Sequence, residues 1–272
     1  MSPQPTRVAV CGAAGRMGQR LVQLVTACPE LALSGAVDRH DSPFFGRDAG
    51  EMAGLGPLGV AVTDDFGPAA AAAEVYLDFS SPEGAGDRAR AAASAGTAAV
   101  IGVTAIPEET VEVIRSAAAT VPVVLAPNMS FGVNLMYRLA ADAASVLGPD
   151  YEIEIVEAHH DRKKDAPSGT ALALLDRLAA ARGLDPASCA VFGRHGTPGA
   201  RPRDEIGVHA VRGGEIVGAH TVLFAGPGEI MEITHRAQSR DALAGGAIRA
   251  ALWIRGKGPG LYTFGDVIGL KG

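Results

Sequence analysis

Two adjacent histidines and three cationic side chains stand close together near the middle of the sequence. The segment from Glu157 to Thr170 reads Glu-Ala-His-His-Asp-Arg-Lys-Lys-Asp-Ala-Pro-Ser-Gly-Thr. Histidine exchanges a proton near neutral pH, and arginine and lysine bind carboxylate or phosphate groups. A short run of cations by itself is more often a solvated loop. The two histidines and the helix start that follows favour instead a pocket for an anion, with proton-transferring groups beside it.

The elements on either side of this segment must position its side chains. Tyr151 to Glu157 alternates polar and apolar residues, which predicts a strand with one buried face, so the histidines lie at the end of a strand. Pro167 to Thr170 precedes the apolar run Ala171 to Leu178, and this order is typical of a helix start. A helix start presents N–H groups and positive potential, so we expect an anion to bind there.

A second pattern with chemical meaning lies near the beginning of the chain. The apolar strand Arg7 to Cys11 is followed by glycines at positions 12, 15 and 18, a helix from Arg16 to about Thr26, and a second strand that ends at Asp38. This order predicts a dinucleotide-binding turn, in which the glycines let the backbone approach a pyrophosphate and the acid accepts from the ribose. Arg39 can pair with a 2′-phosphate, so we expect both NADPH and NADH to be used, with the preference left open.

The following segments continue the alternation of strands and helices. Strands are predicted at 75–79, 98–102 and 121–126, with helices at 82–95 and 107–118 between them, which indicates a doubly wound parallel sheet. Because ligands bind outside the carboxyl ends of such strands, Gly102, Thr104 and Asn128 are candidates for the nicotinamide end. The alanine-rich stretch 64–73 is interpreted as a loop without a function.

The pattern changes after Ser130. A helix is predicted at 131–147, and mainly strands follow from residue 190, the last three of which (207–212, 216–224 and 229–235) suggest an antiparallel meander. A final helix begins near Arg240. We therefore predict an α/β protein with a Rossmann-type doubly wound sheet and a second α+β domain with a mainly antiparallel open sheet. The dinucleotide-binding domain is expected at 1–130 and 241–272, and the substrate-binding and oligomerisation domain at 131–240.

Composition limits the class of protein further. The net charge of −6 and 20% charged residues argue against nucleic-acid or membrane-surface binding. No apolar run approaches the roughly 20 residues that span a bilayer, and no signal-peptide core is evident, so a cytoplasmic location is expected. Cys11, Cys28 and Cys189 fit neither a disulfide framework nor a zinc site, and we expect reduced cysteines and no metal.

Taken together, these segments resemble the 4-hydroxy-tetrahydrodipicolinate reductase (dihydrodipicolinate reductase) family over nearly the whole chain. The resemblance is carried by residues 12–18, 102–104, 126–130 and 212–218, by His220, and above all by 157–170. It implies NAD(P)H-dependent reduction of 4-hydroxy-2,3,4,5-tetrahydrodipicolinate to 2,3,4,5-tetrahydrodipicolinate in diaminopimelate and lysine biosynthesis. It also implies a homotetramer whose substrate domains associate through their sheets.

The resemblance also implies roles for individual residues. His159 is then a proton donor or acceptor and Lys163 the proton donor, while His160, Gly169 and Thr170 hold the carboxylates of a small dicarboxylate substrate. The implied cofactor contacts are Gly12, Ala13, Ala14, Gly15, Arg16, Met17, Asp38, Arg39, Gly102, Val103, Thr104, Ala126, Pro127, Asn128 and Met129. Ser81 departs from the family, because some members carry a basic residue there, and this weakens the expectation of a strong NADPH preference.

Two other classes of function remain open at this point. One is another two-domain NAD(P)-dependent dehydrogenase that acts on an amino acid or a semialdehyde, and only the segment 157–170 separates it from the reductase. The other is a non-catalytic redox sensor that binds NAD(P)H and signals to a partner. His159 and Lys163 in one loop argue against the sensor, because binding alone does not require them.

Overall fold

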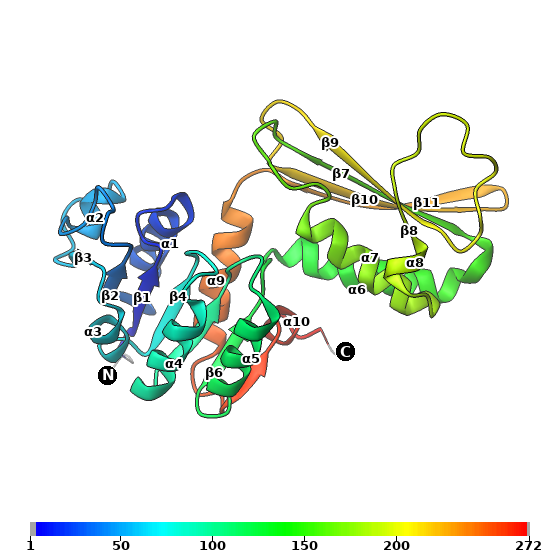
Figure 1. Cartoon of the computed structure of the whole chain (residues 1–272). Coiled ribbons are helices and arrows are strands. Elements are labelled where there is room, and N and C mark those ends of the chain that lie inside the picture. Colours follow the sequence, from blue (N-terminus) through cyan, green and yellow to red (C-terminus); the bar gives the residue numbers. More distant parts are fainter. Residues whose placement is uncertain (1–3, 271–272) are drawn as a thin grey trace. The chain divides into compact units, whose positions relative to one another are not determined.

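The chain divides into two compact units. In the computed structural model, which describes residues 4–270, unit 1 comprises Met1–Ser130 with Asp241–Gly272, and unit 2 comprises Phe131–Arg240 (Figure 1). The chain therefore leaves unit 1 after Ser130 and returns to it at Asp241. Each unit has a sheet of its own and a core of its own.

Unit 1 is built on a parallel sheet with the strand order β12-β6-β5-β4-β1-β2-β3. Every neighbouring pair in it is parallel. Its strands are β1 (Thr6–Cys11), β2 (Leu31–Val37), β3 (Val62–Thr63), β4 (Val75–Asp78), β5 (Ala98–Ile101), β6 (Pro122–Leu125) and β12 (Gly260–Tyr262). From β1 the chain adds β2 and β3 on one side and then β4, β5 and β6 on the other, as in doubly wound sheets. The predicted Rossmann-type architecture is therefore confirmed.

Helices cover both faces of this sheet. They are α1 (Arg16–Ala27), α2 (Ala49–Met52), α3 (Phe66–Ala71), α4 (Ala85–Ala95), α5 (Glu108–Ala117), α9 (Asp241–Trp253) and α10 (Phe264–Val267). Successive residues of β1 serve two different cores, because side chains alternate across a strand. Val8 and Val10 pack in the cluster that includes α1 and α9, whereas Ala9 and Cys11 pack in the cluster that includes α4 and α5.

The interpretation of residues 64–73 as a loop is wrong. Phe66–Ala71 forms α3, and the carboxylate of Asp65 accepts a hydrogen bond from the N–H of Gly67 at its start. Ala69 and Ala70 are buried against the sheet. Alanine has the strongest helix propensity and an aspartate is a favoured cap, so a short helix was available to this sequence.

Unit 2 packs two long helices against one face of a five-stranded sheet. Its elements are α6 (Phe131–Leu147), the 3-10 turn η1 (Gly148–Asp150), β7 (Glu152–His159), α7 (Gly169–Arg182), α8 (Pro186–Cys189), β8 (Ala190–Phe192), β9 (Ile206–Arg212), β10 (Gly218–Gly226) and β11 (Glu229–Ala237). Alternate residues of β7, namely Ile153, Ile155 and Glu157, are buried, and the two isoleucines share a core with residues of α6 and α7. This alternation is the one that the sequence predicted for the strand before the histidines.

The predicted meander of the last three strands is wrong in one respect. The sheet order is β11-β10-β7-β9-β8, so β7 lies between β9 and β10. β7 is parallel to β9 and antiparallel to β10, which makes the sheet mixed. The loop 213–217 is long enough to pass over one strand, because two strand spacings of about 4.8 Å each are within its reach. The β10–β11 hairpin is antiparallel as predicted.

Candidate active site

The glycine turn after β1 brings backbone against backbone. Gly12 has a φ of 74°, and a Cβ there would lie 2.8 Å from the Cα of Ser80. A Cβ on Gly18 would lie 2.1 Å from the carbonyl oxygen of Gly12, so α1 packs directly on the turn. The helix begins after Gly15 and has no acidic residue in its first turn. The start of α1 therefore fits the pyrophosphate of a dinucleotide.

Asp38 is fixed beside this turn by its own carboxylate. Oδ2 accepts a hydrogen bond from the N–H of Ala14 at 2.7 Å, and Oδ1 accepts one from the N–H of Arg39 at 2.9 Å. The guanidinium of Arg39 pairs with Asp41 at 3.1 Å, and both side chains are largely exposed. Asp38 and Arg39 thus follow the carboxyl end of β2, next to the turn. These are the residues predicted to contact the ribose and the 2′-phosphate.

A cavity of about 820 Å³ opens at this edge of the unit 1 sheet. Its lining includes Gly12, Ala14, Gly15, Asp38 and Arg39 from the predicted cofactor set. Ala13 is fully buried and Met17 packs in the core below the turn, while Arg16 begins α1. Residues 102–104 and 126–129 follow β5 and β6, the strands beyond β4, and lie outside the described lining of this cavity.

The loop after β4, of which only Ser81 was expected near the cofactor, forms another wall of this cavity. Asp78, fully buried at the end of β4, accepts a hydrogen bond from Arg88 Nε at 2.7 Å. Arg88 also donates from Nη2 to the carbonyl oxygen of Ser81 at 2.9 Å and from Nη1 to that of Glu83 at 3.2 Å. Ser80, Ser81 and Glu83 line the cavity. A charged residue ending an apolar strand was the available signal, because a buried carboxylate requires a partner.

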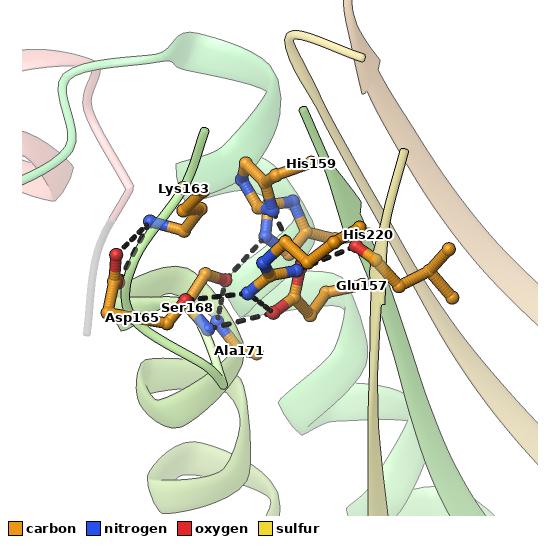
Figure 2. A network of polar contacts seen from close by, with 9 residues as sticks. Glu157, His159, Lys163, Asp165, Ser168, Ala171 and His220 are labelled. Atoms are coloured by element: carbon orange, nitrogen blue, oxygen red, sulfur yellow. Dashed lines mark hydrogen bonds and ion pairs between the residues drawn. The ribbon is translucent and has the colours of Figure 1, made fainter. Parts of the chain in front are cut away.

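In unit 2, β7 carries a buried carboxylate next to the first histidine (Figure 2). Glu157 is fully buried, and its Oε2 lies 2.6 Å from Nδ1 of His159. Arg212 of β9 donates from Nη1 to Oε2 and from Nη2 to Oε1, both at 2.8 Å. The N–H of Ser168 donates to Oε1 at 3.0 Å. The carboxylate thus joins a strand, its neighbour and the start of α7.

At the start of α7, Ser168 contacts a further histidine, His220 of β10, which was not among the predicted site residues. Ser168 caps the helix by accepting from the N–H of Ala171 at 3.2 Å, and its Oγ lies 3.0 Å from Nε2 of His220 on β10. The ring of His220 is buried and meets that of His159 edge to face, with centroids 5.2 Å apart (Figure 2). Burial, together with repulsion from His159 whenever that ring is protonated, lowers the pKa of His220 to about 4. His220 is therefore neutral at neutral pH.

The loop between β7 and α7 carries the lysine. Nζ of Lys163 contacts both carboxylate oxygens of Asp165, at 2.9 and 2.8 Å (Figure 2). The N–H of Asp161 donates to the carbonyl oxygen of Gly214 at 3.3 Å, and Arg162 forms an ion pair with Glu215 at 3.0 Å. The 213–217 loop thus contacts the loop of Lys163 through Gly214 and Glu215.

The remaining predicted residues lie around the same loop. The N–H of Lys163 donates to the carbonyl oxygen of His160 at 3.2 Å, so His160 is part of the tight turn. Gly169 is the first residue of α7, and a Cβ there would meet open space. Thr170 is hydrogen-bonded to Tyr137 of α6. The structure thus brings His159, His160, Lys163, Gly169 and Thr170 together at one end of unit 2.

The ionisation of the buried pair follows from its surroundings. Burial alone raises the pKa of Glu157, but hydrogen bonds from Arg212, His159 and the N–H of Ser168 outweigh it, and the pKa lies below its ordinary value. Burial lowers the pKa of His159; Glu157 opposes this, and Lys163 and Arg212 add to it. The carboxylate is therefore charged and the imidazole mainly neutral near neutral pH. Such a pair can accept and return a proton.

Two further features concern the helices and the potential metal ligands of the chain. Within residues 4–270, no helix is both long enough and apolar enough to cross a membrane. Over the same residues, no group of three or more His, Cys, Asp or Glu side chains is arranged to hold a metal ion. The three cysteines are unpaired, and Cys11 is buried in β1 as predicted.

Comparisons with known proteins were made for the whole chain. A family model described as "Dihydrodipicolinate reductase, N-terminus" matches residues 6–129, and one described as "Dihydrodipicolinate reductase, C-terminus" matches residues 132–268. The 4-hydroxy-tetrahydrodipicolinate reductase of Anaeromyxobacter dehalogenans is 53% identical over 267 residues, covering 98% of this chain and 99% of the relative. That of Alkalilimnicola ehrlichii is 52% identical and covers 97% and 99%.

Solved structures show the same fold. A dipicolinate-bound dihydrodipicolinate reductase from Paenisporosarcina sp. TG-14 aligns with a TM-score of 0.75 at 24% identity, covering 95% of this chain and 97% of the other. An amine dehydrogenase from Mycobacterium smegmatis aligns with a TM-score of 0.60 at 16% identity, covering 95% of each chain. These likenesses show the fold alone, and the family is shown by the family models and the sequence relatives.

Proposed function

Because the chain belongs to the dihydrodipicolinate reductase family, we propose that it reduces 4-hydroxy-tetrahydrodipicolinate to tetrahydrodipicolinate with NADPH or NADH, in the biosynthesis of diaminopimelate and lysine. Unit 1 is then the dinucleotide-binding domain, and unit 2 holds the dicarboxylate. We also propose a cytoplasmic location, which cell fractionation tests. Recovery of the protein in a membrane fraction would contradict it.

The observation that carries the proposal is the joint placement of His159, Lys163 and the start of α7 within unit 2. A histidine with a buried carboxylate partner, an ion-paired lysine amine and a helix start lie around one loop. This set suits a substrate that has carboxylates to bind and a proton to receive. A redox sensor that only binds NAD(P)H would need none of these groups.

The residues of this loop have separable tasks. Reduced nicotinamide supplies a hydride when bound. Hydride addition to an unsaturated heterocycle leaves an anion, which Lys163 or His159 protonates. A positioned general acid of this kind contributes about 10²- to 10⁴-fold to the rate. His160 and the helix start at Gly169 and Thr170 hold the substrate carboxylates, because N–H groups at a helix start favour anions.

The direct test is oxidation of NADPH with the cyclised product of pyruvate and aspartate semialdehyde as substrate. We expect loss of nicotinamide absorbance that depends on both enzyme and substrate. Competition by pyridine-2,6-dicarboxylate is expected as well, because its two carboxylates match those of the substrate. Turnover of an amino acid or an uncyclised semialdehyde, with no turnover of the cyclised substrate, would instead support the other dehydrogenase reading.

The cofactor cavity allows both nicotinamide dinucleotides. Asp38 suits a ribose 2′-hydroxyl and Arg39 suits a 2′-phosphate, and both line the same cavity. We expect calorimetric titration to detect binding of NADH and NADPH. Arg39→Ala should weaken NADPH at least several-fold and leave NADH nearly unchanged, because only NADPH carries the extra phosphate. Equal losses for the two cofactors would remove Arg39 from phosphate binding.

We further propose a homotetramer that forms through the sheet face of unit 2 that is turned away from α6 and α7. Among the side chains of that face, Val211 and Ile230 are 48% and 66% exposed. Exposed apolar side chains on a sheet face are typical of an association surface. Multi-angle light scattering should give four times the chain mass, and Ile230→Lys should lower it. A monomer at micromolar concentration would contradict the proposal.

A further inference from the structure

The carboxylate of Glu157 has its hydrogen-bonding capacity used by four donors or donor candidates. Oε1 accepts from Arg212 Nη2 at 2.8 Å and from the N–H of Ser168 at 3.0 Å. Oε2 accepts from Arg212 Nη1 at 2.8 Å and lies 2.6 Å from Nδ1 of His159. An ionised carboxylate is an acceptor only. The proton between Oε2 and the imidazole therefore resides on Nδ1.

This assignment decides which nitrogen of His159 is available for chemistry. A neutral imidazole carries one proton, so a proton on Nδ1 leaves Nε2 with a lone pair. Nε2 lies beside Gly218, where a Cβ would come within 3.1 Å of it. The glycine thus leaves room on that side of Nε2. The basic nitrogen is the one directed away from Glu157.

Arg212 connects this histidine to the loop of the lysine. Besides both oxygens of Glu157, its Nη2 donates to the backbone carbonyl oxygen of Asp165 at 2.7 Å. Asp165 is the residue whose carboxylate holds Lys163. One guanidinium therefore fixes the carboxylate partner of His159 and the backbone beside the partner of Lys163. Its planar fork suits this bidentate contact, which a lysine could not make.

We propose that Glu157, held by Arg212, is a positioning residue that keeps His159 in the Nδ1–H tautomer, so that Nε2 is the nitrogen that takes up a proton from solvent and passes it to the substrate anion. This inference rests on the proposed function of His159 in proton transfer. Neither Glu157 nor Arg212 is proposed to touch the substrate. The charged or titratable groups that face His159 are Glu157 on β7, Lys163 in the following loop, Arg212 on β9 and His220 on β10.

Glu157→Gln tests the tautomer because the amide cannot replace both oxygens. Its oxygen should take the Oε1 position, where Arg212 Nη2 and the N–H of Ser168 both donate. The NH₂ group then occupies the Oε2 position, where the hydrogen bond from Arg212 Nη1 is lost and Nδ1 must become an acceptor. The tautomer of His159 is expected to switch from Nδ1–H to Nε2–H. Glu157→Asp keeps a carboxylate and is expected to retain the Nδ1–H form at least in part.

The measurement is ¹⁵N NMR of the imidazole nitrogens in the full-length protein without substrate, assigned with His159→Gln. Wild type should show Nδ1–H, and Glu157→Gln should show Nε2–H. An Nε2–H tautomer in wild type overturns the proposal, and this result does not require any variant to fold. An unchanged Nδ1–H tautomer in Glu157→Gln overturns it too. These spectra do not depend on whether the protein is a reductase.

Kinetics supply the second readout. With the wrong tautomer, the kcat of Glu157→Gln should fall by about 10²- to 10⁴-fold with little change in KM, as for other carboxylate–histidine pairs. Glu154→Gln is the matched control, since it removes a carboxylate from the same strand, and should keep kcat within about threefold. A switched tautomer with unchanged kcat would separate the two claims: Glu157 would then position the ring, but His159 would not carry the proton.

Discussion

Two glutamates three residues apart on β7 each contact arginine and histidine side chains, and they lie on opposite faces of the sheet. Glu157 contacts Arg212 and His159, and Glu154 contacts Arg194, Arg201 and His209. An odd separation along a strand places the two side chains on opposite faces. We refer to these groups as the Glu157 cluster and the Glu154 cluster. The residue types alone therefore do not distinguish a site from a structural contact.

The neighbours of each cluster make the difference. The Glu157 cluster lies against the start of α7 and the loop of Lys163. The Glu154 cluster fastens the 193–205 loop to the strands, because Arg194 and Arg201 belong to that loop and Arg201 also donates to the carbonyl oxygen of Glu205 at 2.6 Å. A Cβ on Gly207 would lie 1.7 Å from Glu154, so the carboxylate covers the backbone of β9. The first arrangement leaves a histidine nitrogen beside the loop of Lys163, and the second fastens the 193–205 loop.

The largest difference between the two clusters is expected in turnover. His159→Gln should lower kcat by about 10²- to 10⁴-fold, the usual contribution of a general acid or base. His209→Gln removes the corresponding imidazole of the Glu154 cluster and should leave the kcat of the folded protein close to that of wild type. Steady-state kinetics on both variants, with circular dichroism to verify folding, makes the comparison. Similar losses of kcat in the two variants would contradict the assignment of one cluster to the active site and the other to a structural contact.

The second difference is in stability. Glu157→Ala removes a fully buried carboxylate and takes this counter-ion from Arg212, whose side chain is 20% exposed, so the loss of unfolding free energy should be about 3–5 kcal/mol. Glu154→Ala should cost less, roughly 1–3 kcal/mol, because the Glu154 side chain is 21% exposed and its partners Arg194 and Arg201 keep other acceptors. Urea denaturation at neutral pH measures both. A larger loss for Glu154→Ala would contradict the burial argument.

The third difference is in how stability changes at low pH. Burial raises the pKa of Glu154, but hydrogen bonds from Arg194, Arg201 and His209 outweigh it and lower the pKa to about 2. A lowered folded-state pKa gives stability that is fully present above the unfolded-state value and is lost as the pH falls through the folded-state value. The stability difference between wild type and Glu154→Gln should therefore shrink between about pH 5 and pH 2. A difference that stays constant over this range would argue against the ion pairs.

The smallest effect is expected for a solvent-exposed ion pair. Arg162 and Glu215 form a two-bond ion pair next to the site, but their side chains are 59% and 84% exposed. Exposed pairs of this kind often contribute nothing measurable. Glu215→Gln should therefore leave the melting temperature and kcat unchanged within error. A clear loss of kcat would show that this pair, and not only Arg212, holds the loop of Lys163.

The sequence by itself determined the local order of this protein. The glycine turn, its helix and Asp38 follow one another along the chain, and the alternation in β7 and the Ser168 helix start are local patterns too, so hydrophobic period and turn chemistry were sufficient to predict them. The same holds for the segment that contains His159, His160 and Lys163. The resemblance to a reductase family rests on these contiguous stretches, and the comparisons confirm it.

Only the tertiary structure decided which distant residues meet. β7 lies between β9 and β10, and this position brings Arg212 and His220 to Glu157 and Ser168 from two different strands. The loop before β10 suits both a hairpin and a crossing over β7, and the predicted meander chose the hairpin, which is wrong. The wall that Arg88 and Asp78 build beside the cofactor turn depends likewise on one side chain that reaches back from a helix. Long-range pairing is set by the packing of whole faces, which local patterns do not encode.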